Sequence, residues 1–233
     1  MRGFIITGTS SGIGKALCDL LLEDDQNVVL GICRTQSIEH ANYEHLHMDL
    51  KDISELEDID FPDWSHAEQI SLIHNAGWIG PIQKLGKQEV GAIASSYIIN
   101  LVAPAVLSNQ FIAKYQSSVA QKVILSIGSG ASRSPIAGWS TYCSSKSGLD
   151  MLSKCIAEEN SNFICLSIAP GKVDTPMQND IRFADESEFP RLKEFQNYYK
   201  KGELVGAKEV AEKYKIALSD PAKYLDINRV SEI

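Results

Sequence analysis

Short apolar runs rich in β-branched residues alternate with longer amphipathic stretches along most of the chain, and this alternation constrains the fold most strongly. The pattern predicts strands at 4–8, 28–33, 43–50, 70–77, 122–129 and 163–171, and a last strand at 223–227. It predicts helices at 12–24, 88–115, 140–159, 190–202 and 207–220. Strands that alternate with helices form parallel sheets covered on both faces. We therefore expect residues 1–233 to form a single-domain doubly wound α/β Rossmann fold, with a parallel sheet of about seven strands.

The composition excludes several classes of partner. The chain of 233 residues carries a formal net charge of -8, which argues against nucleic acid and membrane surfaces, since both are polyanionic. No apolar run reaches the roughly 18 residues of a membrane-spanning helix, so none is expected. The five cysteines are odd in number and show no C-x-x-C pair, which is typical of reduced thiols in a cytoplasmic protein. The five histidines lack metal-ligand spacing, so no metal is expected.

A glycine-rich turn, TGTSSGIG at 7–14, lies between the first predicted strand and the first predicted helix. Its glycines, Gly8, Gly12 and Gly14, are spaced G-x-x-x-G-x-G rather than in the commoner G-x-G-x-x-G pattern. Glycine lets the backbone approach a pyrophosphate closely, and the following helix offers free N–H groups at its positive end. A simple tight turn is the alternative, but the position of the turn before an apolar helix favours a dinucleotide site.

Arg34 decides which dinucleotide is expected. An acid about 20 residues beyond the glycine turn holds the ribose 2′-hydroxyl of NAD, whereas an arginine there accommodates the 2′-phosphate of NADP. Arg34 lies in GICRTQS, a segment with no acid before Glu39. Thr35 and Ser37 add hydroxyl donors, and a guanidinium binds a phosphate through two hydrogen bonds. We therefore expect NADPH; an arginine on a solvated surface loop is the alternative.

A tyrosine and a lysine four residues apart lie in STYCSSKSG at 140–148. Positions i and i+4 share one face of a helix, so Tyr142 and Lys146 are expected side by side. A neighbouring cation favours the phenolate and lowers the pKa of the phenol from its usual value of about 10, which suits proton transfer. The alternative is a solvated helix face with a chance pair.

Taken in order, these motifs resemble the short-chain dehydrogenase/reductase family over nearly the whole chain. The resemblance is carried by TGTSSGIG, HMDL, HNAG, YIINLVAP, the Y-x-x-x-K pair, PGKVDT, and a serine 13 residues before the tyrosine. Within the family, SGASRSPIAGWSTYCSSKSG, APGKVDTPMQNDIR and FPRLKEFQNYYKKGEL are most similar to the sepiapterin reductase and bacterial benzil reductase group. The chain departs from the family at His74, which replaces an asparagine, and at Ser11, where many NADP-dependent relatives carry a basic residue.

The resemblance implies a catalytic set and a cofactor cradle. The implied catalytic residues are Asn100, Ser129, Tyr142 and Lys146. The implied cofactor-binding residues are Gly8, Ser10, Ser11, Gly12, Ile13, Gly14, Arg34, Thr35, Asp49, Leu50, Asn75, Ala76, Gly77, Tyr142, Lys146, Pro170, Gly171, Val173 and Thr175. In these roles Tyr142 donates a proton to a carbonyl oxygen that Ser129 also hydrogen-bonds. Lys146 holds the nicotinamide ribose, and Asn100 holds a relay water.

The resemblance also implies a substrate end. Substrate contacts are implied at Ser129, Trp139, Tyr142 and Met177, with a lid over 176–205. We expect NADPH-dependent reduction of an aromatic or vicinal dicarbonyl, such as benzil or sepiapterin, to a hydroxy ketone. The alternatives are an NADP-dependent alcohol or sugar dehydrogenase of the same fold, and an NADP-binding regulatory protein without turnover. The family further implies a homodimer or homotetramer.

Overall fold

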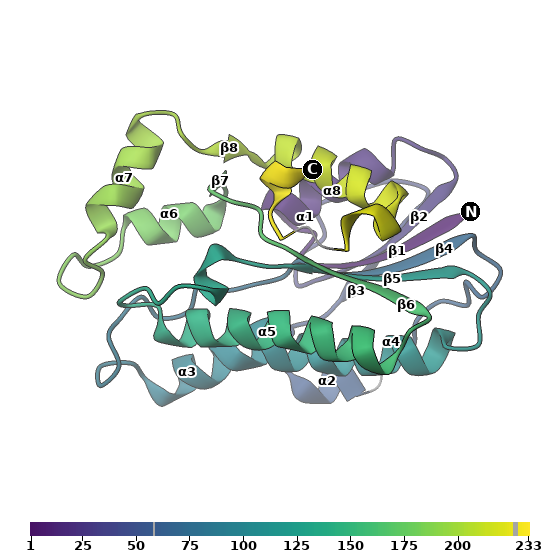
Figure 1. The fold of residues 1–233 in the computed structure, drawn as a ribbon, viewed down its shortest axis with the longest axis horizontal. Helices are drawn as coiled ribbons and strands as arrows, with labels where there is room; N and C mark the ends of the chain where they lie inside the picture. Colours follow the sequence, from purple (N-terminus) through teal and green to yellow (C-terminus); the bar gives the residue numbers. More distant parts are fainter. Residues whose placement is uncertain (58, 226–227) are drawn as a thin grey trace.

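Six parallel strands form one sheet through the centre of the molecule (Figure 1). The computed structural model describes residues 1–57, 59–225 and 228–233, and its strand order is β3-β2-β1-β4-β5-β6. The strands are β1 (Arg2–Thr7), β2 (Asn27–Cys33), β3 (Tyr43–His47), β4 (Gln69–His74), β5 (Gln121–Ile127) and β6 (Phe163–Ile168). This order confirms the doubly wound α/β fold. The order reverses between β1 and β4, so a crevice for a ligand is expected at their carboxyl ends.

The described residues form six strands in the central sheet, against the prediction of about seven, and Arg229 adds a single parallel bridge to Ala169 beyond β6. The last predicted strand, 223–227, begins inside a short 3-10 helix at Pro221–Tyr224, and its residues 226 and 227 lie outside the described residues. Pro221 opens that helix because its ring presets a helical φ and lacks the N–H that a strand would need. Two further short strands, β7 (Val173–Asp174) and β8 (Val205–Gly206), pair with each other in a separate ladder.

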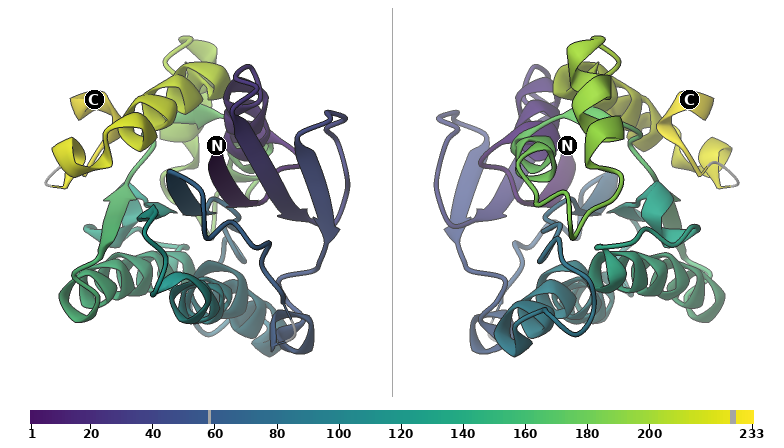
Figure 2. Two further views of the ribbon diagram at one scale, coloured as in Figure 1. Left: turned by 90° about the vertical axis from the view of Figure 1, so that its right-hand side faces the viewer. Right: turned by 90° about the vertical axis from the view of Figure 1, so that its left-hand side faces the viewer.

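Helices cover both faces of the sheet, as the side views in Figure 2 show. One face carries α1 (Gly12–Leu21) and α8 (Ala207–Ser219); the other carries α2 (Ile53–Glu57), α4 (Ala103–Tyr115) and α5 (Ser140–Glu159). Successive side chains of a strand point to opposite faces, so β1 serves both layers. Phe4 and Ile6 pack in the cluster with α1 and α8, whereas Ile5 packs in the cluster with Phe111 of α4.

The predicted 88–115 helix is observed as α3 (Val90–Tyr97), a π-helical turn (Ile98–Val102) and α4. Because α4 begins after that turn, Pro104 falls in its first turn, where the missing N–H costs no helical hydrogen bond. From the length of its apolar runs, the chain is expected to contain no membrane-spanning helix. In the described part of the chain, one helix, Val90–Tyr115, is long and apolar enough to cross a membrane, on length and mean hydropathy (1.8) alone. That helix packs against α5 and β4.

Two helices, α6 (Pro176–Arg182) and α7 (Leu192–Lys200), project beyond the carboxyl ends of the strands (Figure 1). They enclose a third apolar cluster, which also includes Trp139 and Tyr142 from the start of α5. The start of α5, which carries the Y-x-x-x-K motif, therefore lies at the same end of the molecule as α6 and α7.

Candidate functional site

A cavity of about 830 Å³ opens at the carboxyl ends of β1 and β4 and extends to α6 and α7. It is lined by every residue predicted for the site except Gly14, Thr35 and Asn100. The sequence motifs, which are spread over residues 8–177, therefore converge on one cavity at the place where the strand order reverses.

The glycine turn forms one wall of this cavity because its backbone takes conformations that other residues avoid. Gly8 and Gly12 have φ values of +75° and +57°, which glycine adopts without steric cost. A Cβ at Gly8 would lie 2.9 Å from the Cα of Ala76, so the turns after β1 and β4 touch. Gly14 has a packing role instead, since a Cβ there would lie 2.3 Å from Nδ2 of Asn75.

Thr7, which sequence reasoning missed, ties these two turns together. Its Oγ1 accepts the backbone N–H groups of Asn75 (3.1 Å) and Ala76 (3.0 Å). Asn75 donates in return from Nδ2 to the carbonyls of Thr7 (2.9 Å) and Gly8 (3.0 Å). Thr7 is 2 % exposed, so its hydroxyl resembles that of any buried strand threonine, and nothing in the one-dimensional pattern distinguishes it.

The first turn of α1 leaves positive potential facing the cavity. None of the described side chains caps the helix at Ser11, and its first turn carries no acid. The N–H groups at such an end, together with the helix dipole, bind anions. Nearby, Arg34 is exposed, lines the cavity and makes no ion pair within residues 1–57, 59–225 and 228–233. This donor set suits the phosphates of a dinucleotide.

The loop after β2 differs in detail from the expectation that its hydroxyl groups serve a phosphate. Ser37 donates its hydroxyl to the carbonyl of Thr9 (3.2 Å), which fixes the loop to the glycine turn. Thr35 does not line the cavity, and its carbonyl accepts from Sγ of Cys33 (3.2 Å). Arg34 is thus the member of this loop that presents charge to the cavity. Lys51, which was not predicted, also lines the cavity, and its ammonium lies 5.5 Å from the centroid of the Trp78 ring.

The four predicted catalytic residues gather between β5, the π-helical turn and α5. Tyr142 is 7 % exposed and Lys146 is 3 % exposed. The Lys146 ammonium donates to the carbonyl of Ile127 (2.9 Å). The Ser129 hydroxyl accepts from the N–H of Ala131 (3.1 Å) and hydrogen-bonds Tyr142.

Asn100 lies behind this group rather than in the cavity wall. Its Oδ1 accepts the N–H of Trp78 (2.9 Å) and its Nδ2 donates to the carbonyl of Trp78 (2.8 Å). A Cβ at Gly77 would lie 3.4 Å from Oδ1 of Asn100 and 3.7 Å from Nζ of Lys146, so the asparagine and the lysine flank the same glycine. The π-helical turn supplies this placement, as such turns often do at functional sites.

The acid–base balance of the site differs from the sequence prediction. Burial raises the pKa of Tyr142, and a hydrogen bond with Ser129 opposes the rise. Burial also lowers the pKa of Lys146 to about 8, and Asp150 opposes that shift. The prediction that the cation would lower the pKa of the phenol is therefore wrong for this structure, because desolvation disfavours both charged forms. The tyrosine is held as a neutral phenol, the form that donates a proton.

His74 replaces the first asparagine of the family's N-N-A-G motif and is buried at the end of β4. Its Nε2 hydrogen-bonds the hydroxyl of Ser108 (2.8 Å), while Nδ1 has no partner among the described residues. Burial, followed by repulsion from Lys146, lowers the pKa of His74 to about 3. The residue is a neutral, buried histidine held by Ser108.

The far end of the cavity has an aromatic wall, defined as Trp139, Phe189, Phe195 and Tyr198. Phe189 stacks on Trp139 with ring centroids 5.1 Å apart and an interplanar angle of 7°. The ring centroid of Phe195 lies 5.2 Å from that of Trp139. The Tyr142 ring is edge-on to Trp139, with centroids 5.7 Å apart. Trp139, Phe195 and Tyr198 line the cavity together with Met177. Sequence reasoning identified Trp139 and Met177 and missed the three α6–α7 aromatics.

The structure contains two further features that bear on the chemistry. Among the described residues, no group of three or more His, Cys, Asp or Glu side chains lies close enough to hold a metal ion. Burial raises the pKa of Cys143, which keeps it a thiol rather than the thiolate that a nucleophile requires.

Comparison with known proteins places these observations in a family. The family model described as short chain dehydrogenase matches residues 3–186. The chain is 33% identical over 214 residues to a benzil reductase ((S)-benzoin forming) of Bacillus subtilis, covering 88% of each chain. It is 28% identical over 232 residues to the sepiapterin reductase of Mus musculus, covering 90% of this chain and 88% of that protein. A short chain dehydrogenase/reductase crystal structure from Saccharomyces cerevisiae has the same fold, with a TM-score of 0.87, 24% identity, and coverage of 99% and 96%.

Proposed function

Since the chain belongs to the short-chain dehydrogenase family and is an oxidoreductase acting on CH–OH or C=O groups, we propose that it is an NADPH-dependent reductase. Its substrate is an aromatic or vicinal dicarbonyl, which it converts to a hydroxy ketone. The observation that carries the proposal is the position of Tyr142, a buried neutral phenol that faces an aromatic wall in the same cavity as Arg34.

The cofactor residues fit NADPH in three places. The glycine turn and the uncapped start of α1 offer N–H groups to the pyrophosphate. Arg34 offers its guanidinium to the 2′-phosphate, since it has no carboxylate partner within the described residues. Lys146, near Gly77, holds the nicotinamide ribose. The cofactor, when bound, supplies the hydride.

The remaining groups polarise the carbonyl and move one proton. Ser129 and Tyr142 donate hydrogen bonds to the carbonyl oxygen, where negative charge develops during reduction. Tyr142 then gives up its proton to that oxygen, and the burial that keeps the phenol neutral keeps the acid loaded for this step. Lys146 stabilises the resulting phenolate, because an adjacent ammonium favours the charged form.

Residues 176–205 act as the lid of this site, with α6 and α7 as its two helices. The aromatic wall lies between the lid and Tyr142, so a planar ring of the substrate packs against Trp139 and Phe195. A dicarbonyl flanked by aryl groups matches this arrangement, because aromatic rings prefer stacked or edge-on neighbours. The names of the benzil and sepiapterin reductases at about 30% identity point to the same substrate class.

The experiment that tests the proposal is NADPH consumption against benzil, sepiapterin, butane-2,3-dione, acetone and a set of sugars, with NADH in parallel. We expect the highest kcat/KM with benzil or sepiapterin and a clear preference for NADPH. A higher kcat/KM for sugar or alcohol oxidation would instead identify a dehydrogenase, and a lack of turnover with bound NADPH would identify a regulatory protein.

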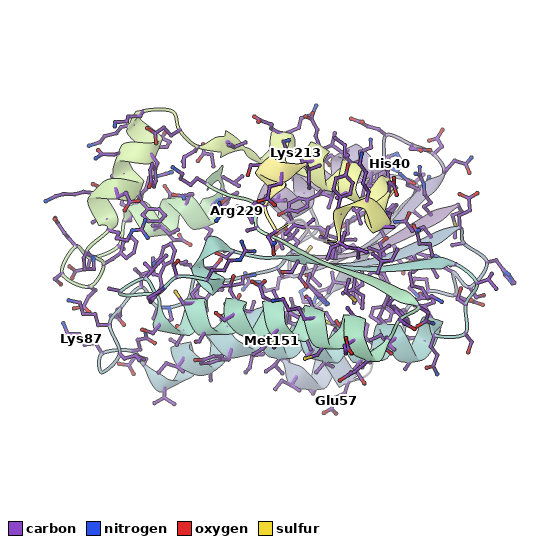
Figure 3. The ribbon with its side chains drawn as sticks, viewed as in Figure 1. His40, Glu57, Lys87, Met151, Lys213 and Arg229 are labelled. Carbon is purple, nitrogen blue, oxygen red and sulfur yellow. The ribbon has the colours of Figure 1, made fainter. Side chains whose placement is uncertain are left out.

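We also propose that a second copy of the chain covers part of the α3–α5 surface. The helix Val90–Tyr115 has a mean hydropathy of 1.8, yet only 28% of its most apolar window is buried. Val90 is 82% exposed, and Met151, on the outer side of α5 in Figure 3, is 57% exposed. Light scattering after size-exclusion chromatography is expected to give a dimer or tetramer, and a monomer at micromolar concentration would contradict this.

A further inference from the structure

Glu188, in the loop between α6 and α7, is a buried carboxylate that does not line the cavity. It is 5% exposed. It accepts a short hydrogen bond from the Lys87 ammonium and another from the backbone N–H of Lys84 (3.2 Å). The Lys84 ammonium also donates to the carbonyl of Ser187 (2.8 Å). These contacts, called the clasp below, tie the lid to a loop about 100 residues earlier, and Figure 3 places Lys87 at the lid end of the molecule.

The clasp acts directly on the backbone next to the aromatic wall. A Cβ at Gly138 would lie 2.7 Å from the carbonyl oxygen of Glu188, so the two backbones are in close contact. The residues that follow on each side, Trp139 and Phe189, are the two rings that stack at 7°. Trp139 then meets Tyr142 edge-on at 5.7 Å. A continuous line of contacts therefore joins the clasp to the proton donor.

We propose that Glu188 is a positioning residue for the substrate: the clasp holds the Phe189–Trp139 stack at the distance from Tyr142 that an aryl group requires. The inference rests on the proposed function, since it assumes that the wall receives an aromatic substrate. Charge supports it, because the hydrogen bonds from Lys87 and Lys84 keep the pKa of Glu188 below its usual value and the carboxylate stays ionised. A group that only stabilised the lid would affect every substrate alike, whereas a group that positions the wall affects those with a ring.

The kinetic test compares Glu188→Ala and Lys87→Met with two matched controls. Lys87→Arg preserves the cation, and Glu186→Ala removes an exposed carboxylate of the same loop, which pairs with Lys193 at 2.6 Å. We expect both clasp variants to raise KM for benzil about tenfold, because the aromatic contacts are displaced. We expect kcat to change less than about twofold, and kcat/KM for butane-2,3-dione and the Kd of NADPH to stay at wild-type values. Both controls are expected to behave as wild type.

Fluorescence gives a direct view of the wall. In a Trp64→Phe/Trp78→Phe background Trp139 is the single tryptophan, and at 5% exposure it is shielded from solvent. We expect Glu188→Ala to shift its emission to the red and to increase its quenching by acrylamide, while Glu186→Ala changes neither. Unchanged emission together with an unchanged KM for benzil would overturn the inference. An equal loss of kcat/KM with benzil and with butane-2,3-dione would also overturn the inference, because that result would show that Glu188 has only a structural role. If the wild type reduces neither benzil nor sepiapterin, the proposed function is wrong, and the fluorescence comparison still decides whether the clasp positions Trp139.

Discussion

The adenosine end of the cavity and its substrate end are built by different means. At the adenosine end, the walls are the turns that directly follow β1, β2, β3 and β4, and each lies within a few residues of a sheet strand. At the substrate end, the walls are side chains from three separate segments, at 136–142, 176–198 and 77–79. The first end depends on backbone conformation and single side chains, whereas the second depends on packing between distant parts of the chain. Substitutions at the two ends should therefore differ in which substrates they affect.

Tyr142, where the two ends meet, should show the largest effect. Tyr142→Phe keeps the ring in the aromatic cluster and removes the acid, so kcat should fall by roughly 10²–10⁴ with every carbonyl substrate. The Kd of NADPH, measured by fluorescence titration, should stay at the wild-type value because the adenosine end is untouched. Near-wild-type kcat in this variant would show that another group supplies the proton.

His74 tests the stability of the sheet on the adenosine side. Its pKa is about 3 in the folded chain against a usual 6.5, so the unfolded chain binds more protons between these values. Stability from this group is complete above pH 6.5 and is lost as the pH falls toward 3. When the pH is lowered from 7 to 4, the free energy of unfolding of His74→Asn should therefore rise by about 3 kcal/mol relative to that of the wild type. Urea unfolding at several pH values measures this. His66→Asn, at an exposed histidine, is the control, and parallel pH curves for His74→Asn and wild type would refute the prediction.

Arg34 tests the chemistry of the adenosine end. Arg34→Ala should raise the Kd of NADPH about tenfold to a hundredfold and leave that of NADH nearly unchanged, since a charged bidentate contact is lost. The loss should be the same for every carbonyl substrate, as expected for a change confined to this end. Lys51→Ala removes another cation that lines the cavity, beside the Trp78 ring, and is the informative contrast. If Lys51→Ala changes the NADPH preference and Arg34→Ala does not, the 2′-phosphate lies near Trp78 instead.

Phe195 should show the smallest effect and the most selective one. It lines the cavity and lies 5.2 Å from the Trp139 ring. Phe195→Leu should lower kcat/KM for benzil about tenfold, because an aromatic contact is lost while the volume is largely kept. The substitution should leave kcat/KM for butane-2,3-dione and the Kd of NADPH unchanged. Equal losses for the two diketones would mean that the two ends of the cavity do not differ in the way described.

The difference between the ends also explains how far the sequence could predict the site. The glycine turn, Arg34 and the Tyr142–Lys146 pair are local patterns with a local physical meaning, so their positions followed from spacing. Phe189, Phe195 and Glu188 meet Gly138 and Trp139 only through tertiary packing, some 50 residues away in sequence, and no periodicity marks that contact. The pKa of Tyr142 was predicted in the wrong direction for a related reason. The presence of Lys146 can be read from the sequence, but the burial that raises the pKa of Tyr142 and lowers that of Lys146 cannot.

The π-helical turn at Ile98–Val102 makes this region sensitive to the number of residues in the helix. An α-helix rotates by about 100° per residue, so the wider turn sets the rotational phase of α4 relative to α3. Asn100, within that turn, hydrogen-bonds the backbone of Trp78. Phe111 and Tyr115, which follow in α4, pack in the core cluster against the sheet. Deleting one residue between 98 and 102 would leave composition and hydropathy almost unchanged, yet it would turn either the asparagine or the core aromatics away from their partners. Among homologous chains, insertions and deletions should therefore be rarer in this turn than in the exposed loop at 83–89.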